Sequence, residues 1–301
     1  MRKYTIVIAA TLASACAEGD EPEPTRDVGE RVIDGEEDYL ETAVGMLGID
    51  CPTASRYCSA TLIGGETVLT AAHCVLDPEN EVDPDTCRFR FTAPHTGSIG
   101  VDEIAIHPRW KGAYDNFKTH DLAVLHLEGL ALGAHTEVLG GVGPFEGDEI
   151  EVVGYGNAAY DDPSTGGVLR SAVTSVTEVA DEYYGYTTDK GGSICNGDSG
   201  GPTFQRVHDT SERRLVGVHS SVRDECSKSF DTRIGAHLGW ILEAGGDDIG
   251  CGGVDYTGYC AGSWVVWCDH GSLRTSDCSG DDRYSACGFV NEQTGYYCVE
   301  P

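Results

Sequence analysis

Basic residues are scarce in this chain of 301 residues. Lysine and arginine together number 20, against 50 aspartates and glutamates, and the formal net charge is −30. Binding to nucleic acid or to an anionic membrane surface depends on a surplus of basic charge, so neither is expected as a partner. The acidic surplus is more simply that of a protein kept soluble outside the cell.

Zinc-binding pairs of the C-x-x-C kind are missing, although the sequence contains 13 cysteines. So many cysteines are unusual in a reducing compartment unless they bind metal. Disulfide bonds in a secreted protein are therefore the better interpretation, and no metal site or cofactor is predicted. The acidic loop 77–85 leaves calcium as a lesser alternative, although its spacing is not that of an EF-hand.

A long apolar run is also missing from the N-terminus, where residues 4–12 are too few to span a bilayer as a permanent helix. A basic start precedes this run and small residues follow it, which predicts a signal peptide over residues 1–16. Residues 13–16 also resemble a bacterial lipobox, in which a lipidated Cys16 would attach the protein to a membrane and leave twelve cysteines to pair. Simple cleavage after residue 15 or 17 is the alternative.

Residues 17–31 are acidic, contain proline and have almost no large apolar side chains, so they are expected to form a disordered propeptide. The segment ends at Arg31, which is followed by the sequence Val-Ile-Asp-Gly. An arginine before a small apolar pair, at the border between disorder and fold, predicts a processing site. The alternative is that Val32 simply begins the first strand.

Forty glycines indicate many turns and short strands. Segments rich in aliphatic or β-branched residues, each bounded by Gly, Asp or Pro, predict strands. These segments are 43–49, 59–63, 67–71, 88–91, 122–127, 149–155, 168–179 and 215–219. Residues 232–244 instead have apolar side chains at helical spacing and end at two glycines, which predicts a helix. Many strands with one late helix predict an all-β domain of two barrels or a sandwich.

The C-terminal part has a composition of its own. Residues 246–250 predict a linker after a main domain over 32–245. Residues 251–301 contain six cysteines and are too short for a large core, so three disulfides are expected to stabilise them, in any of fifteen pairings. Their aromatic side chains either fill a small core, which is favoured, or bind a glycan or a protein surface.

The stretch 196–202, Asn-Gly-Asp-Ser-Gly-Gly-Pro, has a composition that suits a tight turn and not a helix or strand interior. It presents the hydroxyl of Ser199 beside several backbone N–H groups. A nucleophile for acyl transfer needs such an exposed hydroxyl and an oxyanion hole. Alone, the stretch is equally a plain loop, so a base and an orienting acid must be found elsewhere.

Two further stretches supply them. Residues 69–74 end a strand at His73, and residues 120–125 open a strand at Asp121. With Ser199 they give the order His, Asp, Ser. The motifs Val-Ile-Asp-Gly, Ala-Ala-His-Cys, Asp-Leu-Ala-Val and Gly-Asp-Ser-Gly-Gly-Pro follow one another over roughly residues 32–244, and this stretch resembles the trypsin/chymotrypsin family of serine proteases.

The resemblance implies a fold and a set of roles. The fold would be all-β, with two antiparallel six-stranded Greek-key barrels, the active site in the cleft between them and a C-terminal helix. Ser199 would attack the scissile carbonyl, His73 would accept and return its proton, and Asp121 would orient the histidine. The backbone N–H groups of Gly197 and Ser199 would form the oxyanion hole.

Activation by proteolysis is also implied by the resemblance. Cleavage after Arg31 would free the amine of Val32 to pair with Asp198, so a zymogen and a separate activating protease are expected. The resemblance further implies the disulfides Cys58–Cys74 and Cys195–Cys226, and the remaining Cys51 and Cys87 are paired by elimination. The family's disulfide near the nucleophile has no counterpart, because no cysteine lies between residues 87 and 195. That region is expected to be shorter or looser.

Substrate specificity is inferred from the same resemblance. Ser193 stands at the floor of the primary pocket, where trypsins have aspartate, and Val222 would narrow the pocket wall. Both favour small or apolar side chains before the cut. Asp231 would lie near the back of the pocket, and a carboxylate that reached it would restore a preference for arginine or lysine. Ser220 would support the catalytic aspartate and line the substrate cleft.

The expected function is therefore that of a secreted, monomeric serine endopeptidase acting on protein or peptide substrates. An inactive protease-like binding protein, working through its C-terminal module, is the alternative. The complete set of His73, Asp121 and Ser199 argues against that alternative.

Overall fold

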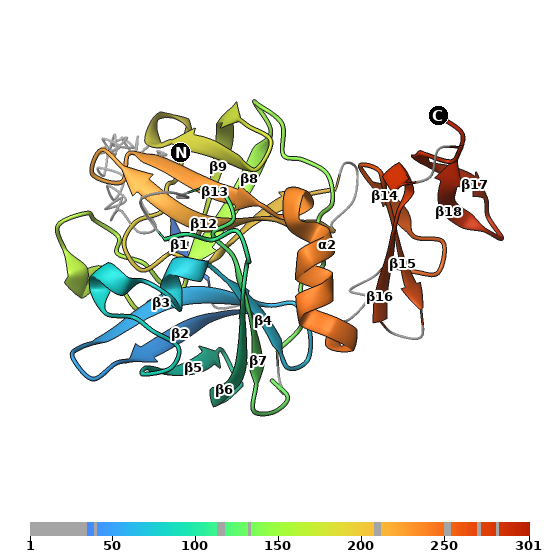
Figure 1. The fold of residues 1–301 in the computed structure, drawn as a ribbon. Coiled ribbons are helices and arrows are strands. Elements are labelled where there is room, and N and C mark those ends of the chain that lie inside the picture. Colours follow the sequence, from blue (N-terminus) through green and yellow to red (C-terminus); the bar gives the residue numbers. More distant parts are fainter. Residues whose placement is uncertain are drawn as a thin grey trace, which may run out of the picture.

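The computed structural model describes residues 35–38, 41–112, 118–131, 134–207, 212–249, 254–269, 272–280 and 283–301. The predicted signal peptide and propeptide, with Cys16, Arg31 and Val32, lie outside these residues, as does Cys251. Two strand-built bodies, the helix α2 (Ile234–Gly245) beside them, and a C-terminal module beyond the helix make up the molecule (Figure 1). Within the described part of the chain, no helix is long and apolar enough to cross a membrane.

The first body is a closed antiparallel barrel with the strand order β2-β3-β4-β7-β6-β5. Its strands are β2 (Val44–Asp50), β3 (Ser55–Leu62), β4 (Thr67–Thr70), β5 (Arg88–Ala93), β6 (Gly97–Ile106) and β7 (Ala123–Leu127). Strand β5 illustrates the alternation that directs side chains in or out, because Phe89 and Phe91 are buried while Arg88 and Arg90 are exposed. The barrel interior is filled by such inward-facing apolar side chains.

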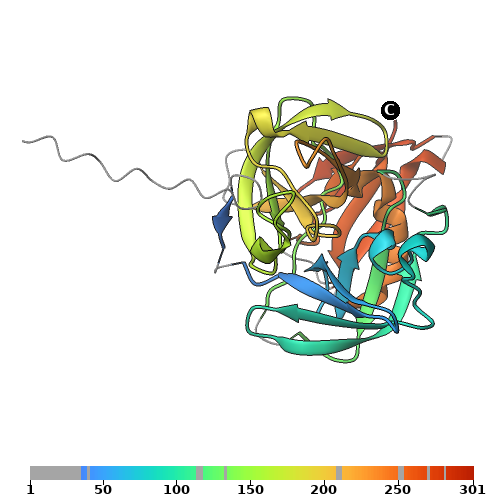
Figure 2. The ribbon, with the colours of Figure 1, turned by 90° about the vertical axis from the view of Figure 1, so that its left-hand side faces the viewer.

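The second barrel has the strand order β9-β10-β13-β12-β11-β8, and β8 closes it by pairing with β9. Its strands are β8 (Glu149–Gly154), β9 (Arg170–Val179), β10 (Tyr183–Thr187), β11 (Pro202–Arg206), β12 (Arg213–Arg223) and β13 (Lys228–Arg233). A two-residue strand, β1 (Glu36–Glu37), pairs with β9 on the outside of this barrel (Figure 2). The prediction of two six-stranded barrels is confirmed, and the sandwich is excluded.

The helix prediction is two residues early at its start, because residues 232 and 233 still belong to β13 and α2 begins at Ile234. Strands β6, β10, β11 and β13 have no counterpart among the predicted segments. Strand β6, for example, carries Asp102 and Glu103 on its exposed side and opens with glycine and serine. Pairing with neighbours on both sides outweighs the weak local preference of such a segment. Short 3₁₀ helices are η1 (Ala72–Cys74), η2 (Pro78–Asn80), η3 (Pro163–Thr165), η4 (Thr188–Lys190), η5 (Gly246–Asp248) and η6 (Cys278–Gly280).

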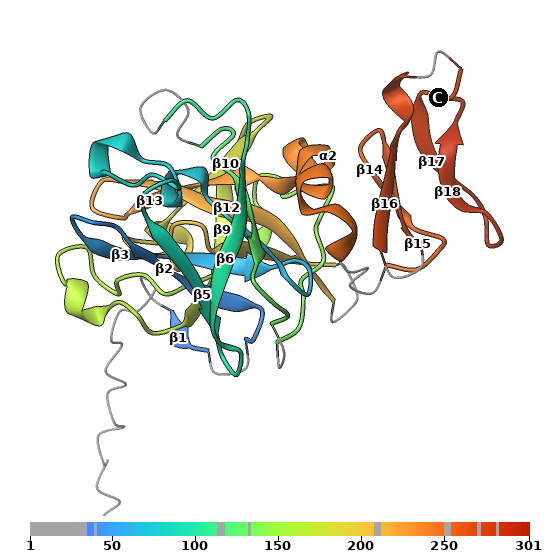
Figure 3. The ribbon, with the colours of Figure 1, turned by 60° about the horizontal axis from the view of Figure 1, so that its bottom comes forward.

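The C-terminal module consists of a three-stranded sheet and a two-stranded hairpin. The strands are β14 (Tyr259–Ala261), β15 (Trp264–Asp269), β16 (Ser272–Asp277), β17 (Ala286–Asn291) and β18 (Gly295–Val299). The sheet lies between α2 and the hairpin (Figure 3). The disulfides Cys260–Cys287 and Cys278–Cys298 join the two parts, and Cys268 is also disulfide-bonded.

The segment expected as a linker packs closely against the first barrel over residues 246–249. The Asp248 carboxylate accepts a hydrogen bond of 2.7 Å from the backbone N–H of Glu66. The side chain of Ile249 is only 1% exposed and belongs to the barrel core. In the module itself, the Tyr259 hydroxyl donates at 2.8 Å to a backbone carbonyl between the barrels, that of Leu139. The module is therefore held against the barrels by specific contacts.

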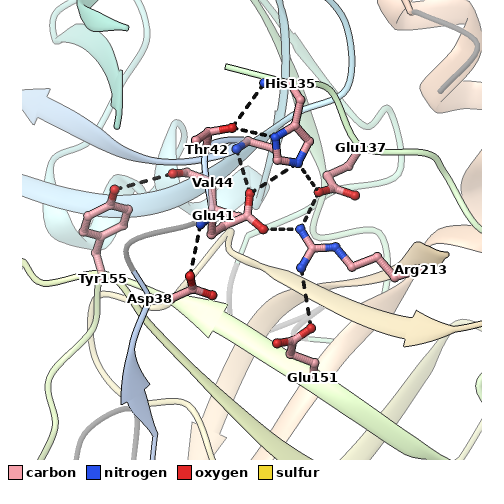
Figure 4. Close-up of polar contacts among 10 residues, drawn as sticks. Asp38, Glu41, Thr42, Val44, His135, Glu137, Glu151, Tyr155 and Arg213 are labelled. Atoms are coloured by element: carbon pink, nitrogen blue, oxygen red, sulfur yellow. Dashed lines mark hydrogen bonds and ion pairs between the residues drawn. The ribbon is translucent and has the colours of Figure 1, made fainter. Parts of the chain in front are cut away.

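An ionic clasp of four residues, Glu41, His135, Glu137 and Arg213, ties the barrels together (Figure 4). Glu41 precedes β2, His135 and Glu137 lie on the crossing between the barrels, and Arg213 opens β12. The Arg213 guanidinium bridges the carboxylates of Glu41 and Glu137, which are 2% and 6% exposed. Glu151 of β8 lies 3.5 Å from the same guanidinium. The two buried carboxylates thus share one cation.

Candidate active site

The loop that carries Ser199 enters β11 at Pro202, a position at the start of a strand where proline removes no ladder hydrogen bond. Its backbone is anchored on both sides, because the carbonyl of Ser199 accepts from the N–H of Ser59 at 2.8 Å and the N–H of Gly200 donates to His219 at 2.8 Å. Gly200 has φ +80°, and a Cβ there would lie 2.0 Å from the Thr70 hydroxyl. The close packing therefore requires glycine beside Ser199.

Two backbone N–H groups beside the serine are not used in hydrogen bonds of the loop itself. Those of Gly197 and Ser199 donate to no acceptor among the described residues, whereas their neighbour Asp198 donates to Cys195 at 3.1 Å. Gly197 has φ +98°, and a Cβ there would lie 2.7 Å from the Tyr57 ring. A side chain is excluded at this position, so the loop presents bare backbone donors.

His73 and Asp121 are brought together although 48 residues separate them. The imidazole Nδ1 of His73 lies 2.8 Å from Oδ2 of Asp121, and its backbone N–H donates to Oδ1 at 2.9 Å. The Ser220 hydroxyl donates to Oδ2 at 2.6 Å, so the fully buried carboxylate has three donors. Burial disfavours the charged imidazole, but the charge and hydrogen bond of Asp121 outweigh it and raise the pKa of His73.

The disulfide Cys58–Cys74 places the histidine beside the serine loop. The sulfur of Cys74 lies 3.9 Å from Nε2 of His73 and 3.6 Å from the carbonyl oxygen of Ser199. The same sulfur thus contacts the second imidazole nitrogen and the backbone of the serine.

This arrangement can be compared with known proteins. The family model described as Trypsin matches residues 34–241. The chain belongs to the trypsin family of serine endopeptidases. It is 26% identical to Venom serine protease 34 of Apis mellifera over 213 residues, 62% of this chain but only 51% of that protein, so it spans about half of that relative. It is 22% identical to Trypsin of Saccharopolyspora erythraea over 238 residues, 74% of this chain and all of that protein, and 28% identical to human Kallikrein-8 over 202 residues, 61% and 75% of the two chains.

The trypsin-family domain has the disulfides Cys58–Cys74, Cys195–Cys226 and Cys51–Cys87, which are the pairs named from the sequence. Cys195 directly precedes the serine loop, and Cys226 lies between β12 and β13. The first two of these pairs hold the histidine and serine segments to the barrels.

Ser193 is fully buried, and its hydroxyl lies 2.6 Å from that of Ser229. Across the β12–β13 ladder, Ser229 is opposite the partly buried Val222. Ser193 and Ser229 thus present two neutral hydroxyls that satisfy each other, next to a branched apolar side chain. Ser229 was not among the site residues named from the sequence. It lies two positions before Asp231 on β13, so the two residues share a face of the strand, and this spacing was the available signal.

Asp231 is enclosed by partners of its own. Its fully buried carboxylate accepts hydrogen bonds from the hydroxyls of Tyr184 at 3.0 Å and Tyr186 at 3.2 Å, and Thr203 also donates to it. Nδ1 of His219 lies 3.0 Å from Oδ1. Burial and the Asp231 charge raise the pKa of both tyrosines well above the ordinary value. Sequence reasoning did not find this network, because its members come from four strands.

Asp198 is fully buried. Its two carboxylate oxygens accept from the backbone N–H groups of Gly156 at 2.7 Å and Cys195 at 2.8 Å. Burial raises its pKa to about 6, and the two backbone donors only partly offset that effect. A buried carboxylate of this kind would be stabilised by a cation.

Two groups of described side chains have the composition of a metal site, but neither group is suited to bind a metal ion. The first consists of Cys58, His73 and Cys74, whose sulfurs are joined in a disulfide. In the second, Glu41, His135 and Glu137, the Arg213 guanidinium already bridges the carboxylates. Neither group offers a free thiolate or carboxylate set to a cation.

Proposed function

We propose that this protein is a secreted serine endopeptidase that cuts peptide bonds through Ser199, His73 and Asp121. The observation that supports the proposal most directly is the His73–Asp121 pair, with an Nδ1 to Oδ2 distance of 2.8 Å, next to the serine loop. Five complete disulfides among the described residues suit an oxidising, extracellular setting. Two of the relatives are named as a serine protease and as a trypsin, which fits peptide-bond hydrolysis by a serine.

In the proposed mechanism, Nε2 of His73 takes the proton of the Ser199 hydroxyl as that oxygen attacks the scissile carbonyl. Asp121 holds the Nδ1 proton and stabilises the imidazolium, which is why the pKa of His73 is raised. The carbonyl oxygen, now negative, is bound by the N–H groups of Gly197 and Ser199. His73 then delivers its proton to the leaving amine, and water hydrolyses the acyl-enzyme by the same steps.

We propose further that the enzyme is made as a zymogen, in which cleavage after Arg31 frees the amine of Val32 to pair with Asp198. The geometry around Asp198 makes this reachable. Glu37 of β1 pairs with Arg170, which pairs in turn with Gly154, and a Cβ on Gly154 would lie 2.2 Å from the Asp198 carboxylate. Two strand spacings are about 10 Å, and the five residue steps from Val32 to Glu37 span about 16 Å when extended.

Arg31→Gln is expected to prevent this activation. The variant should react with a fluorophosphonate probe at Ser199 at least about 100-fold more slowly than the processed wild type, because an unpaired Asp198 leaves the oxyanion donors unplaced. Labelling is measured after treatment of both proteins with the same activating protease, for which trypsin serves. Asp198→Asn, cut normally at Arg31, is the companion variant and should label as poorly.

Equal labelling of wild type and Arg31→Gln would contradict the zymogen proposal. Absence of labelling in the processed wild type would favour the alternative, a protease-like binding protein without activity.

We propose that the enzyme prefers small or apolar side chains before the cut. Ser193 and Ser229 offer no charge at the floor of the pocket, and Val222 occupies its wall. The Asp231 carboxylate is surrounded by its own donors, which supports the apolar preference over the basic one. The natural substrate is a protein or peptide with such residues in an accessible segment.

Peptide substrates that differ only in the residue before the cut should show this preference. We expect kcat/KM for alanine and valine to exceed that for arginine by at least about 10-fold, since an unpaired guanidinium in a neutral pocket is poorly solvated. Val222→Gly should improve cleavage after phenylalanine relative to alanine, because it removes the branched wall. A strong preference for arginine would overturn the assignment and would make self-activation at Arg31 feasible.

The remaining expectations concern location and partners. We propose that the protein acts outside the cell as a monomer, either free or attached to the outer membrane by a lipid on Cys16. Its partners would be an activating protease and its substrates. The C-terminal module would direct the enzyme to a surface or a glycan.

A further inference from the structure

The C-terminal module contains a hollow of about 840 Å³ between its sheet and its hairpin. That volume lies within the range of ligand pockets in proteins. Aromatic rings line the hollow from both sides: Trp267 from β15, Tyr296 and Tyr297 from β18, and Tyr256 and Tyr284 from the connecting segments. From the sequence, these rings were expected to fill a small core, yet they surround an open space.

Two of the rings are strongly exposed, and one of these two is hydrogen-bonded through its hydroxyl. Tyr256 and Tyr297 are each 63% exposed, although a tyrosine ring is apolar over most of its surface. The Tyr256 hydroxyl donates to the carbonyl of Glu292 at 3.2 Å, so the ring is fixed and its face remains free. The neighbouring Thr257 carbonyl accepts from the N–H of Tyr296 at 2.8 Å, which binds this segment to the hairpin. Exposed aromatic surface of this kind marks a binding site more often than a structural defect.

The other lining groups define the ligand. The described lining residues are aromatic, hydroxyl-bearing or apolar. Hydroxyls are contributed by Ser276 and Thr294 besides the tyrosines, and Val265 is the buried apolar residue in the lining. Flat aromatic faces together with hydroxyl donors match a neutral sugar ring, which has C–H groups on its faces and hydroxyls around its rim.

We propose that this hollow binds a neutral polysaccharide, with Tyr256 and Tyr297 stacking on sugar rings at its mouth and Trp267 within it. The disulfides Cys260–Cys287 and Cys278–Cys298 join the two walls and keep the hollow open before a ligand arrives. This preorganisation lowers the entropic cost of binding. The inference concerns the module alone and does not rest on the proposed proteolysis.

The test uses the full chain with Ser199→Ala, so that retention is separated from peptide cleavage. Affinity gel electrophoresis with hydroxyethyl cellulose, xylan or galactomannan, together with sedimentation with insoluble chitin, measures retention. We expect retention by at least one of these neutral polysaccharides. Tyr256→Ala and Tyr297→Ala should each weaken it about three- to tenfold, as loss of one aromatic stacking contact implies. Tyr160→Ala, which removes a tyrosine 51% exposed on the second barrel, is the matched control and should leave retention unchanged.

Retention by none of the four polysaccharides would overturn the proposal. Equal retention by the Tyr256→Ala/Tyr297→Ala double variant would do so too, and circular dichroism verifies that this variant is folded. Retention on immobilised denatured casein instead, lost in the double variant, would assign the hollow to peptides. Wild-type peptidase activity, measured in parallel, reports on the proposed function separately.

Discussion

Ser199→Ala should lower kcat for peptide hydrolysis by about 10⁶-fold once the chain has been cleaved at Arg31, as loss of the nucleophile does in another serine protease. The reason is that the acyl-enzyme cannot form without the Ser199 oxygen. Some acceleration over uncatalysed hydrolysis should remain, because the N–H groups of Gly197 and residue 199 still bind the developing oxyanion. Initial rates on a fluorogenic peptide ending in valine before the cut, with residual contaminating protease blocked, provide the measurement.

The matched control for this experiment is Ser98→Ala, on an exposed part of β6 in the first barrel. It should retain full activity and full fluorophosphonate labelling. His73→Ala should fall nearly as far as Ser199→Ala, and the double variant should fall no further, because the two residues act as one unit. An additive loss in the double variant would contradict the assignment of His73 as the base that activates Ser199.

Arg213→Gln should lower the free energy of unfolding by about 3–5 kcal/mol, the usual cost of breaking a buried ion pair on one side. The clasp explains the size of the effect, since Glu41 and Glu137 are 2% and 6% exposed and would be left without their shared cation. For a domain of this size such a loss corresponds to a fall in Tm of roughly 6–20 °C. Urea unfolding followed by circular dichroism, with Tm from calorimetry, measures it.

Arg214→Gln is the matched control, because it removes an arginine at the next position. Arg214 pairs with Glu212, which is 56% exposed, at 3.0 Å. An exposed pair contributes about 0–1 kcal/mol, so this variant should be nearly as stable as the wild type. Equal destabilisation by the two substitutions would show that the clasp has no special role.

The pH dependence separates a lost ion pair from lost packing. Burial alone would raise the pKa of Glu137, but its hydrogen bonds to His135 and Arg213 and their charges lower it below the ordinary 4.5. A lowered folded-state pKa contributes stability above the unfolded value and loses it as the pH falls through the folded value. The gap between wild type and Arg213→Gln should therefore be full near pH 7 and should narrow below about pH 4. A gap independent of pH would indicate lost packing of Arg213, whose guanidinium lies 3.8 Å from the Phe204 ring centre.

Short motifs made much of the site predictable. His73 is followed by Cys74, and Ser199 is followed by Gly200. Each pair belongs to a short motif that can be recognised in the sequence without knowledge of the fold. Strand β5 was found in part, as residues 88–91, from its composition and its bounding residues; the alternation of buried and exposed side chains along it is seen in the structure. The end of β13 was not found, because residues 232 and 233 directly precede the apolar helical pattern, and only their pairing with β12 makes both of them strand.

For the substrate pocket, the sequence predicted the position of one residue but not its partners. It placed Asp231 near the substrate, and the structure gives that carboxylate four partners from other strands. Any of these side chains is unremarkable in its own strand. Their meeting depends on the closure of the barrel, which has no local signature.

By itself, the sequence determined the family, the all-β architecture and the three residues of the proposed catalysis, because these depend on motifs of a few adjacent residues and on short aliphatic or β-branched runs bounded by turn residues. Only the tertiary structure decided how buried charge is balanced and where the molecule is hollow. Arg213 meets Glu41 across 172 positions, and the aromatic hollow needs a sheet and a hairpin joined by two disulfides, which six cysteines could have paired in other ways. Such contacts join residues far apart in the chain, and their energies depend on burial that no short stretch of sequence records.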